Sequence, residues 1–206
     1  MYFLCVHTKT KQEIQGRKFL LIEVRFHGRG GQGCITAALV LIEAALTEGK
    51  WGQKIPVYGG ERRGAPVLAY MRLDDNPIRQ TNFITEPDWI IVLDEGLGKI
   101  VNITAGLKEG GMAIINDRKD PEDIDLAVDL SRVATVDATA ISAKLFGRRA
   151  IPVTNTIMLG AISAVTEVVK LESLFEPIMT RFPGRIGEMN VEAVKLGYES
   201  VKWKDR

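Results

Sequence analysis

Six residues near the start of the chain have the types and spacing of an anion-binding turn. The pattern G-x-G-x-x-G is matched letter for letter by Gly28, Arg29, Gly30, Gly31, Gln32 and Gly33. Glycines let the backbone turn sharply, and a helix that follows presents unpaired N–H groups and a partial positive charge to an anion. These residues predict a site for a phosphate-bearing ligand, with Arg29 as charge partner and Gln32 as a hydrogen-bonding side chain.

Dinucleotide-binding proteins share this pattern but need one more residue. The next strand, about 20 residues on, must end in an acidic side chain that holds the ribose hydroxyls. In this chain that strand lies near 52–60, and its end carries Tyr58 and two glycines. The first acidic residue, Glu61, already stands inside a glycine loop. The motif therefore fails the dinucleotide test, and a plain strand-to-helix turn with close packing is the structural alternative.

A second glycine loop, YGGERRGAP, carries Arg62 and Arg63 between glycines. If the strands beside the two loops are neighbours, both loops emerge at the same edge of the sheet, where α/β proteins bind ligands. Arg29, Arg62 and Arg63 would then converge on a polyanion. Alternatively, the two arginines pair with Glu61 on a subunit surface. The two interpretations are compatible.

Three other polar positions are expected to be structural. His27, at the end of the first strand, is expected to hydrogen-bond to the backbone rather than to act as an acid or base. The pair Asp94-Glu95 follows a buried strand and is expected to cap the next helix. Asn155-Thr156 precedes an apolar helical segment and is expected to cap it. No catalytic residue is therefore predicted in this chain.

Composition narrows the class of protein. The 206 residues include 27 Lys+Arg and 26 Asp+Glu, so a broad nucleic-acid surface is not expected. No apolar run reaches the roughly 18–20 residues of a membrane span, and the start lacks the order of a signal peptide. We expect a cytoplasmic protein. Two cysteines, Cys5 and Cys34, are too few for a four-cysteine iron–sulfur cluster, and no closed zinc site is expected from them with only two histidines, His7 and His27, in the chain.

The expected elements alternate between strands and helices. Buried strands are predicted at 19–28, on both sides of the second glycine loop within 53–73, and at 89–93, 110–117 and 131–138. Helices are predicted at 34–46, 97–108, 139–146, 155–170, 171–182 and 190–204, with a break at 182–187. This alternation is typical of a mostly parallel α/β sheet. We predict a single three-layer α/β domain over 21–206 with a helical C-terminal region, preceded by an N-terminal arm, 1–20.

Five segments, in this order, resemble the gamma subunit of pyruvate:ferredoxin and related 2-oxoacid:ferredoxin oxidoreductases. They are FHGRGGQG, YGGERRGAPVLAYMRL, PDWIIVLDE, PVTNTIMLGAISAVTEVV and NVEAVKLGYE, and they span most of 23–198. The resemblance implies a complex that splits a 2-oxoacid with thiamine diphosphate and Mg²⁺. Electrons then pass through iron–sulfur clusters to ferredoxin, and the acyl group is delivered to coenzyme A.

The resemblance also implies alpha and beta subunits that form the thiamine site and a delta subunit with further clusters, in a heterotetramer. The gamma chain alone is then catalytically silent, which agrees with its few cysteines and its lack of a GDG-type diphosphate motif. Coenzyme A is implied to lie close to the gamma domain, which assigns it to the turn 28–33. The second loop is assigned to the same ligand or to subunit docking through Tyr58, Glu61, Arg62 and Arg63.

Two other functions stay open from the residues alone. One is a free-standing NAD(P)-binding oxidoreductase, which the missing acidic residue disfavours. The other is a regulatory module that binds coenzyme A or a nucleotide without an oxidoreductase partner. Within the family that the chain resembles, the GERRGAP pattern favours pyruvate as the substrate, with 2-oxoisovalerate and other 2-oxoacids as alternatives.

Overall fold

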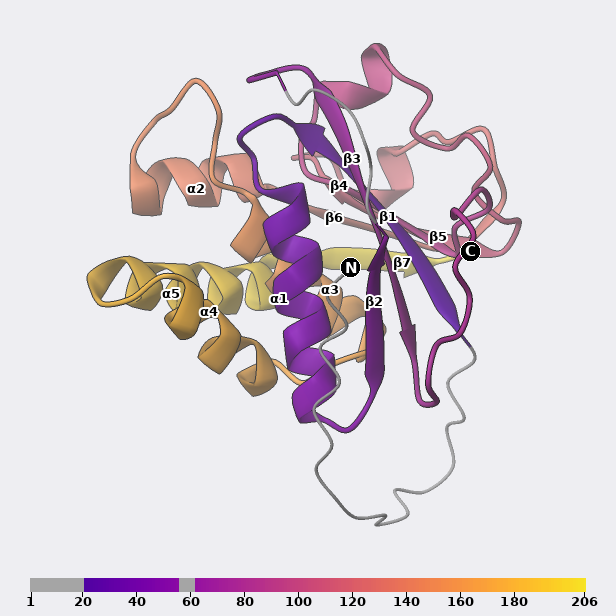
Figure 1. The fold of residues 1–206 in the computed structure, drawn as a ribbon. Coiled ribbons are helices and arrows are strands. Elements are labelled where there is room, and N and C mark those ends of the chain that lie inside the picture. The colour runs from indigo at the N-terminus through magenta and orange to yellow at the C-terminus, as the bar shows by residue number, and fades with distance from the viewer. Residues whose placement is uncertain (1–20, 56–61) are drawn as a thin grey trace.

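A seven-stranded sheet forms the centre of the protein (Figure 1). The computed structural model describes residues 21–55 and 62–206. The strand order is β2-β3-β1-β4-β5-β6-β7. The bounds are β1 Ile22–Arg29, β2 Trp51–Ile55, β3 Pro66–Asp74, β4 Trp89–Val92, β5 Gly111–Asn116, β6 Leu130–Val136 and β7 Lys202–Asp205. Strands β1, β4, β5 and β6 are parallel, whereas β3, β2 and β7 are antiparallel to their neighbours. The predicted α/β class with a mostly parallel core is confirmed.

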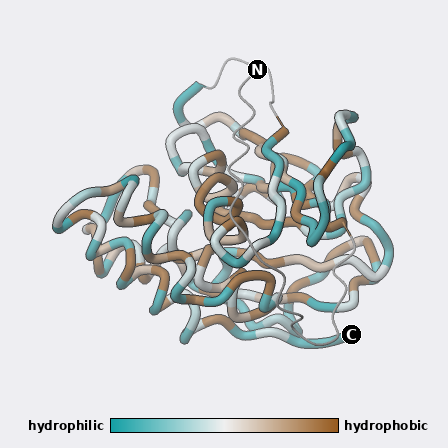
Figure 2. Tube along the Cα trace, turned by 60° about the horizontal axis from the view of Figure 1, so that its bottom comes forward, coloured by the Kyte–Doolittle hydropathy of each residue, from teal (hydrophilic) through white to brown (hydrophobic). Residues whose placement is uncertain are grey.

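Helices cover one face of this sheet. They are α1 Cys34–Thr47, α2 Ala138–Phe146, α3 Asn155–Thr166, α4 Phe175–Arg181 and α5 Arg185–Ser200, with a one-turn 3₁₀ helix, η3 Glu172–Leu174, before α4. Val24 and Phe26 of β1 point into the core on this side, and α1 and α3 contribute mostly apolar residues that are buried. Figure 2 shows the same partition, with hydrophobic residues inside and hydrophilic residues along outer turns. The apolar character of the helices thus reflects burial on most sides.

The other face is covered by turns and one-turn 3₁₀ helices. Ile90, Val92 and Ile115 of the sheet pack there against Leu97 and Ile103. Among the residues that the structure describes, only η1 Leu97–Lys99 and η2 Pro121–Asp123 are helical in this layer. The prediction of a helix over 97–108 was therefore wrong.

Local polar side chains explain why no longer helix forms at 97–108. The Asn102 side chain accepts hydrogen bonds from the Thr104 backbone N–H (3.1 Å) and hydroxyl (3.0 Å), an arrangement that competes with helix formation. Gly106 has a φ of 70°, in the left-handed region. The segment therefore turns twice instead of continuing from η1.

The buried arginine Arg72 fastens the antiparallel side of the sheet. Its side chain is fully buried and its Nε donates to Glu23 Oε1 at 2.8 Å. The other guanidinium nitrogens donate to Gln53 Oε1 (3.2 Å) and to the carbonyls of Gln80 (3.3 Å) and Asn82 (2.9 Å). One side chain therefore joins β1, β2, β3 and the long connection 75–88, with its charge compensated by a carboxylate.

The C-terminal region is helical as predicted, with different limits. Helix α5 begins at Arg185, inside the expected break, and ends at Ser200. The expected helix over 190–204 is wrong at its end, because Lys202–Asp205 returns to the sheet as β7 and pairs with β6. Val201 has extended backbone and is buried, which starts the strand.

Helices α3 and α5 are in direct backbone contact at two glycines. A Cβ atom on Gly160 would lie under 3.0 Å from Val194 O, and one on Gly197 under 3.0 Å from Ile157 O. Glycine is therefore required at both positions by proximity rather than by backbone conformation. Within the described ranges, no helix has the length and apolar character needed to cross a membrane.

Replacing Gly160 with alanine is expected to force α3 and α5 apart. Overpacking of a close contact costs about 1–3 kcal/mol, and a clash with backbone belongs at the upper end. For a chain of this size, about 3 kcal/mol lowers the melting temperature by roughly 6–12 °C. Thermal unfolding of the purified protein measures the change. The matched control is Gly98→Ala, whose new Cβ would meet only an ordinary contact at 3.6 Å, and equal melting temperatures for both variants would contradict the packing argument.

Candidate functional site

The glycine turn connects the end of β1 to the start of α1. The Gln32 N–H donates to Arg29 O at 2.9 Å, which closes the turn. Gly31 and Gly33 have φ values of 97° and 78°, so both occupy the left-handed region that favours glycine. Gly33 is the N-cap of α1, which has no side-chain cap and no acidic residue in its first turn. The N-terminus of this 14-residue helix keeps its partial positive charge uncompensated by such a group.

Three glycines of the motif are also required by packing. A Cβ on Gly28 would clash with the Sγ of Cys34, and one on Gly33 would lie 2.6 Å from Asn155 Nδ2. A Cβ on Gly30 would lie under 3.0 Å from Arg62 O. The motif therefore has the close packing expected of a structural turn, and this packing is compatible with ligand binding at its exposed side.

The two glycine loops meet, as predicted. The Gly30 N–H donates to Ala65 O (2.9 Å), and the Gly64 N–H donates to Gly30 O (3.0 Å). Gly30 and Arg63 form an isolated parallel bridge. The bond from Gly30 N–H to Ala65 O continues the antiparallel pairing of β1 and β3, in which Arg29 lies opposite Pro66, whereas the Gly30–Arg63 bridge has the parallel sense. Tyr58 and Glu61, also predicted for the site, lie outside the described residues.

Arg29 has a carboxylate partner within the chain. Its Nε lies 3.1 Å from Asp94 Oδ1, and its Nη1 donates to Gly64 O at 3.2 Å. Gln32 completes the arrangement, because its Nε2 donates to Asp94 Oδ2 (3.1 Å) while its Oε1 accepts the Arg29 N–H (2.7 Å). Asp94 Oδ1 also accepts the Gly96 N–H at 3.1 Å, but Gly96 is the N-cap residue of η1 and no side chain caps this helix, so the predicted capping by Asp94-Glu95 is wrong. The positive charge of Arg29 is thus already partly compensated.

An open cavity of about 700 Å³ lies over the turn. Its lining comprises Gly30, Gly31, Arg63, Arg149, Ala150, Ile151 and Val153. Arg63 and Arg149 are exposed, and neither takes part in an ion pair with another described residue. Arg62 is exposed as well but does not line this cavity. Two guanidinium groups with no ion-pair partner in the described part of the chain, beside a helix without a side-chain cap, form a surface suited to phosphate.

Sequence reasoning missed Arg149. The residue follows α2 in the connection 147–153, which contributes four of the seven lining residues. A detectable signal was present, because Arg148-Arg149 repeats the paired arginines of the second glycine loop. Only the folded arrangement brings this pair to the turn.

Asn155 and its neighbours differ in detail from the expected cap. Thr154 is the N-cap residue of α3 and makes no side-chain cap; its hydroxyl instead donates to Leu93 O at 3.1 Å. Thr156 donates to Asn190 Oδ1 at 2.9 Å, joining α3 to α5. The Asn155 side chain packs against Gly33, and its Oδ1 is buried without a hydrogen-bond partner among the described residues. The predicted capping by Asn155-Thr156 is therefore wrong.

His27 is buried and accepts a hydrogen bond from a charged side chain. Arg25 Nε donates to His27 Nε2 at 2.9 Å, and Arg25 Nη2 donates to Ile103 O at 2.9 Å. Burial, assisted by the Arg25 guanidinium, lowers the pKa of His27 from 6.5 to about 4. The expected structural role is retained, but the partner is a side chain rather than the backbone.

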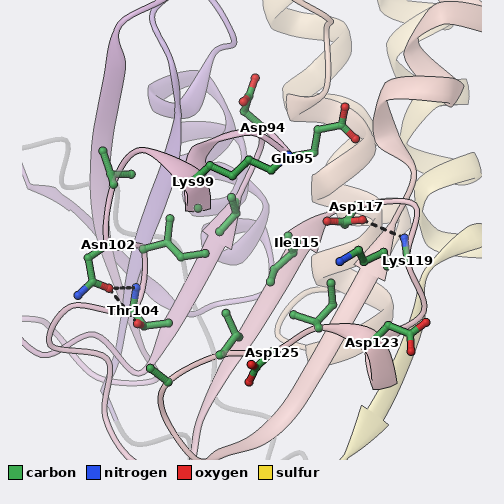
Figure 3. A pocket seen from close by; sticks show the side chains of 17 residues that line it. Asp94, Glu95, Lys99, Asn102, Thr104, Ile115, Asp117, Lys119, Asp123 and Asp125 are labelled. Atoms are coloured by element: carbon green, nitrogen blue, oxygen red, sulfur yellow. Dashed lines mark hydrogen bonds between the residues drawn. The ribbon is translucent and has the colours of Figure 1, made fainter.

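A second cavity, of about 380 Å³, lies beyond the ends of β4 and β5 (Figure 3). Its charged lining consists of Asp94, Glu95, Lys99, Asp117, Lys119, Asp123 and Asp125. Five carboxylates against two lysines make it unsuited to phosphate. Within residues 21–55 and 62–206, no group of His, Cys, Asp and Glu is arranged to hold a metal ion.

Comparison with known proteins defines the class to which this chain belongs, a subunit of a 2-oxoacid oxidoreductase. The chain belongs to the pyruvate ferredoxin/flavodoxin oxidoreductase family, whose model matches residues 23–200. Within that family it is a gamma subunit, as its relatives show.

Two relatives illustrate this relationship. The pyruvate synthase subunit PorC of Methanothermobacter thermautotrophicus is 46% identical over 88% of this chain and 97% of its own length. The common gamma subunit of the pyruvate/ketoisovalerate oxidoreductases of Thermococcus litoralis is 49% identical over the same shares. These identities confirm the resemblance read from the five segments.

Solved structures of related proteins have the same fold as this chain. The pyruvate oxidoreductase subunit PORC of Thermotoga maritima has a TM-score of 0.76 and 36% identity over 92% of this chain and 100% of that one. The 2-oxoglutarate:ferredoxin oxidoreductase of Magnetococcus marinus, solved with coenzyme A bound, has a TM-score of 0.65 at 17% identity. It covers 89% of this chain and 31% of that one, and it shares the fold.

The Arg25–His27 contact predicts a pH-dependent stability. Because the folded pKa of His27 lies below 6.5, the unfolded chain binds more protons between pH 6.5 and 4. The contribution of His27 to the free energy of unfolding should be fully present above about pH 6.5 and should fall by about 3 kcal/mol as the pH approaches 4. Denaturant unfolding at a series of pH values measures this loss.

The control for this prediction is His27→Gln. Glutamine keeps an acceptor for Arg25 Nε but cannot be protonated. The variant should lose less stability than the native chain over the same pH interval, since only the carboxylates still titrate. Identical losses in the two proteins would show that His27 does not contribute.

Proposed function

We propose that this chain is the coenzyme A-binding gamma subunit of a complex that converts pyruvate, coenzyme A and oxidised ferredoxin to acetyl-CoA, CO₂ and reduced ferredoxin. The cavity over the glycine turn carries the proposal, because Arg63 and Arg149 line it and neither has a carboxylate partner within residues 21–55 and 62–206. Coenzyme A has a pyrophosphate and a 3′-phosphate, and such a polyanion matches this lining.

The turn contributes its backbone and its dipole. Gly30 and Gly31 have no side chains that would keep a phosphate from the backbone, and α1 starts directly behind them with an uncapped N-terminus. Asp94 and Gln32 hold the turn in shape through Arg29. Arg29 itself stays a predicted contact, but because Asp94 compensates its charge, we expect Arg63 and Arg149 to bind phosphate more strongly.

The chemistry of bond cleavage and electron transfer belongs to other chains under this proposal. Thiamine diphosphate with Mg²⁺ and the iron–sulfur clusters would reside on alpha, beta and delta subunits, and ferredoxin would accept the electrons. The chain has two cysteines in all, fewer than a four-cysteine cluster needs. We place the complex, a heterotetramer, in the cytoplasm. The role of this chain is to hold the anionic end of coenzyme A while its thiol reaches the acyl group.

Selection of the 2-oxoacid would lie outside this chain. Four of the relatives, among them the one from Thermococcus litoralis, are named as common gamma subunits of pyruvate and ketoisovalerate oxidoreductases. A gamma subunit that serves two such enzymes need not contact the part of the oxoacid that differs. Pyruvate remains the proposed substrate, and 2-oxoisovalerate is the alternative.

Replacing Arg63 or Arg149 with alanine should raise the apparent KM for coenzyme A about tenfold in the assembled enzyme, equivalent to about 1.4 kcal/mol. The kcat should change little, because these side chains contact phosphates remote from the reacting thiol. Arg79→Ala, an exposed arginine on the connection 75–88, is the control. An unchanged KM for coenzyme A in both the Arg63→Ala and the Arg149→Ala enzyme would contradict the proposal that coenzyme A binds in this cavity.

Spectra of the isolated chain distinguish the alternative functions. After anaerobic incubation with iron and sulfide, the chain should show no visible absorbance, because it lacks four cysteine ligands. Titration with NADH should give no binding, since the acidic residue that would hold the ribose is missing. A stoichiometric cluster would contradict the assignment of the clusters to other chains, and tight NADH binding would favour the free-standing oxidoreductase.

A further inference from the structure

Three arginines lie on the face of the sheet that turns away from the helices. Val24 and Phe26 of β1 pack into the core beneath the helices, and successive side chains of a strand point to opposite faces. Arg25 and Arg29 of β1 therefore belong to the other face. Arg72 of β3 belongs to it as well, since its register partner stands two positions before Arg25. The three charges thus follow one another along the β1–β3 pair.

The middle arginine of this row lacks a carboxylate partner. Arg72 pairs with Glu23 at 2.8 Å, and Arg29 pairs with Asp94 at 3.1 Å. Arg25 lies between them, is only 6% exposed, and forms no ion pair within residues 21–55 and 62–206. Glu23 is also shared with a lysine at 3.9 Å, so its charge is already engaged.

Neutral groups surround the Arg25 side chain. It donates to His27 Nε2 and to Ile103 O, each at 2.9 Å. With a pKa of about 4, His27 is uncharged at neutral pH. Burial lowers the pKa of Arg25, and the neighbouring Tyr70 hydroxyl only partly offsets this effect. An arginine nevertheless stays protonated in a protein, so the chain by itself buries a positive charge among neutral groups, an unfavourable arrangement.

Accessible apolar side chains border this charge. On β3, Tyr70 lies opposite Arg25, and Leu68 lies two positions further along the same face. Leu68 is 36% exposed and Tyr70 is half-buried. Phe83, which is 61% exposed, stands next to a carbonyl that accepts a hydrogen bond from Arg72. An arginine among aromatic and aliphatic side chains is typical of the centre of a protein interface.

We propose that the surface formed by Leu68, Tyr70 and Phe83 around Arg25 docks another subunit of the oxidoreductase complex, which presents an Asp or Glu side chain among apolar residues. The carboxylate of that subunit compensates Arg25, as carboxylates of this chain compensate the arginine on either side. The relatives are named as subunits, which makes a neighbouring subunit the occupant. This inference goes beyond the proposed function, because it does not depend on coenzyme A.

Two substitutions of opposite charge at Leu68 test the sign of the partner's charge. Leu68→Glu and Leu68→Lys remove the same apolar contact, but the new carboxylate repels the partner's carboxylate, whereas the new ammonium group attracts it. Sedimentation velocity of the purified complex over a dilution series measures the dissociation constant of this chain from the other subunits. Leu68→Glu should raise this constant about tenfold more than Leu68→Lys does. The matched controls, Leu46→Glu and Leu46→Lys at an exposed position of α1, should leave it unchanged.

Substitutions of Arg25 test the buried charge itself. Arg25→Met should raise the same dissociation constant about tenfold, because the partner's carboxylate loses its cation, and Arg25→Lys should retain the affinity. The melting temperature of the purified chain should not fall in Arg25→Met, since methionine removes a buried charge. A lower melting temperature with an unchanged dissociation constant would show a purely structural arginine and overturn the proposal.

The new amine of Leu68→Lys also identifies the partner. A carbodiimide couples an amine to an adjacent carboxylate, forming an amide with loss of water. Mass spectrometry of the cross-linked complex should find this amine joined to an Asp or Glu of a different subunit. A bond to Glu13 or Glu61 of this chain or of a second copy would overturn the proposal.

The remaining outcomes separate this inference from the proposed function. Equal weakening by Leu68→Glu and Leu68→Lys would overturn the acidic partner, and no weakening by either would overturn the docking surface. The apparent KM for coenzyme A should be unchanged in the assembled Leu68→Lys enzyme. If Arg63→Ala and Arg149→Ala leave that KM unchanged while Leu68→Glu releases the chain, the proposed function fails and the docking surface stands.

Discussion

The backbone contact between Gly30 and the residues Arg62 and Arg63 determines the geometry of the whole carboxyl edge. Hydrogen bonds from Gly30 N–H to Ala65 O and from Gly64 N–H to Gly30 O join the two loops beyond β1 and β3, and the Arg62 carbonyl leaves no room for a side chain on Gly30. Because β1 also continues into α1, this one contact fixes the helix N-terminus, the second glycine loop and the cavity between them. Asp94 then secures the turn from the β4 side through Arg29 and Gln32. A charged surface can be built here because the backbone beneath it is held without side chains.

The G-x-G-x-x-G pattern fits both a dinucleotide site and a closely packed turn, so the pattern alone does not distinguish them. Gly28, Gly30 and Gly33 are required for packing against Cys34, Arg62 and Asn155. A dinucleotide site and this turn therefore share the same steric needs, and they differ only in what the next strand supplies. Here the next strand in the sequence, β2, is separated from β1 by β3. No side chain at the end of β2 is thus a direct neighbour of the turn in the sheet.

Prediction from sequence succeeded where a local pattern has one physical outcome. The short apolar segments at 89–93 and 110–117 predicted buried strands of a parallel sheet, and β4 and β5 form there. The two glycine loops were expected at one edge of the sheet, and they meet there. It failed where the deciding partner is distant. No residue near Lys202–Asp205 in the sequence indicates that this segment pairs with β6. The hydrogen bonds of the Arg72 guanidinium likewise need acceptors from β1, β2 and the connection 75–88, which lie far apart in the sequence. Arg149 and the Arg29–Asp94 pair were missed for the same reason, since each joins segments more than 60 positions apart.

The two faces of the sheet differ in how they resist local opening. One face is backed by α1 and α3, and α3 is in direct backbone contact with α5 at Gly160 and Gly197. The other face is covered by short turns and the one-turn helices η1 and η2. Amide hydrogens of β4 and β5 lie between these layers, so their exchange with solvent should proceed from the turn-covered side. The carboxyl edge borders both layers. The protein therefore combines a rigid support with a more deformable cover, and the second can open locally without disturbing the first.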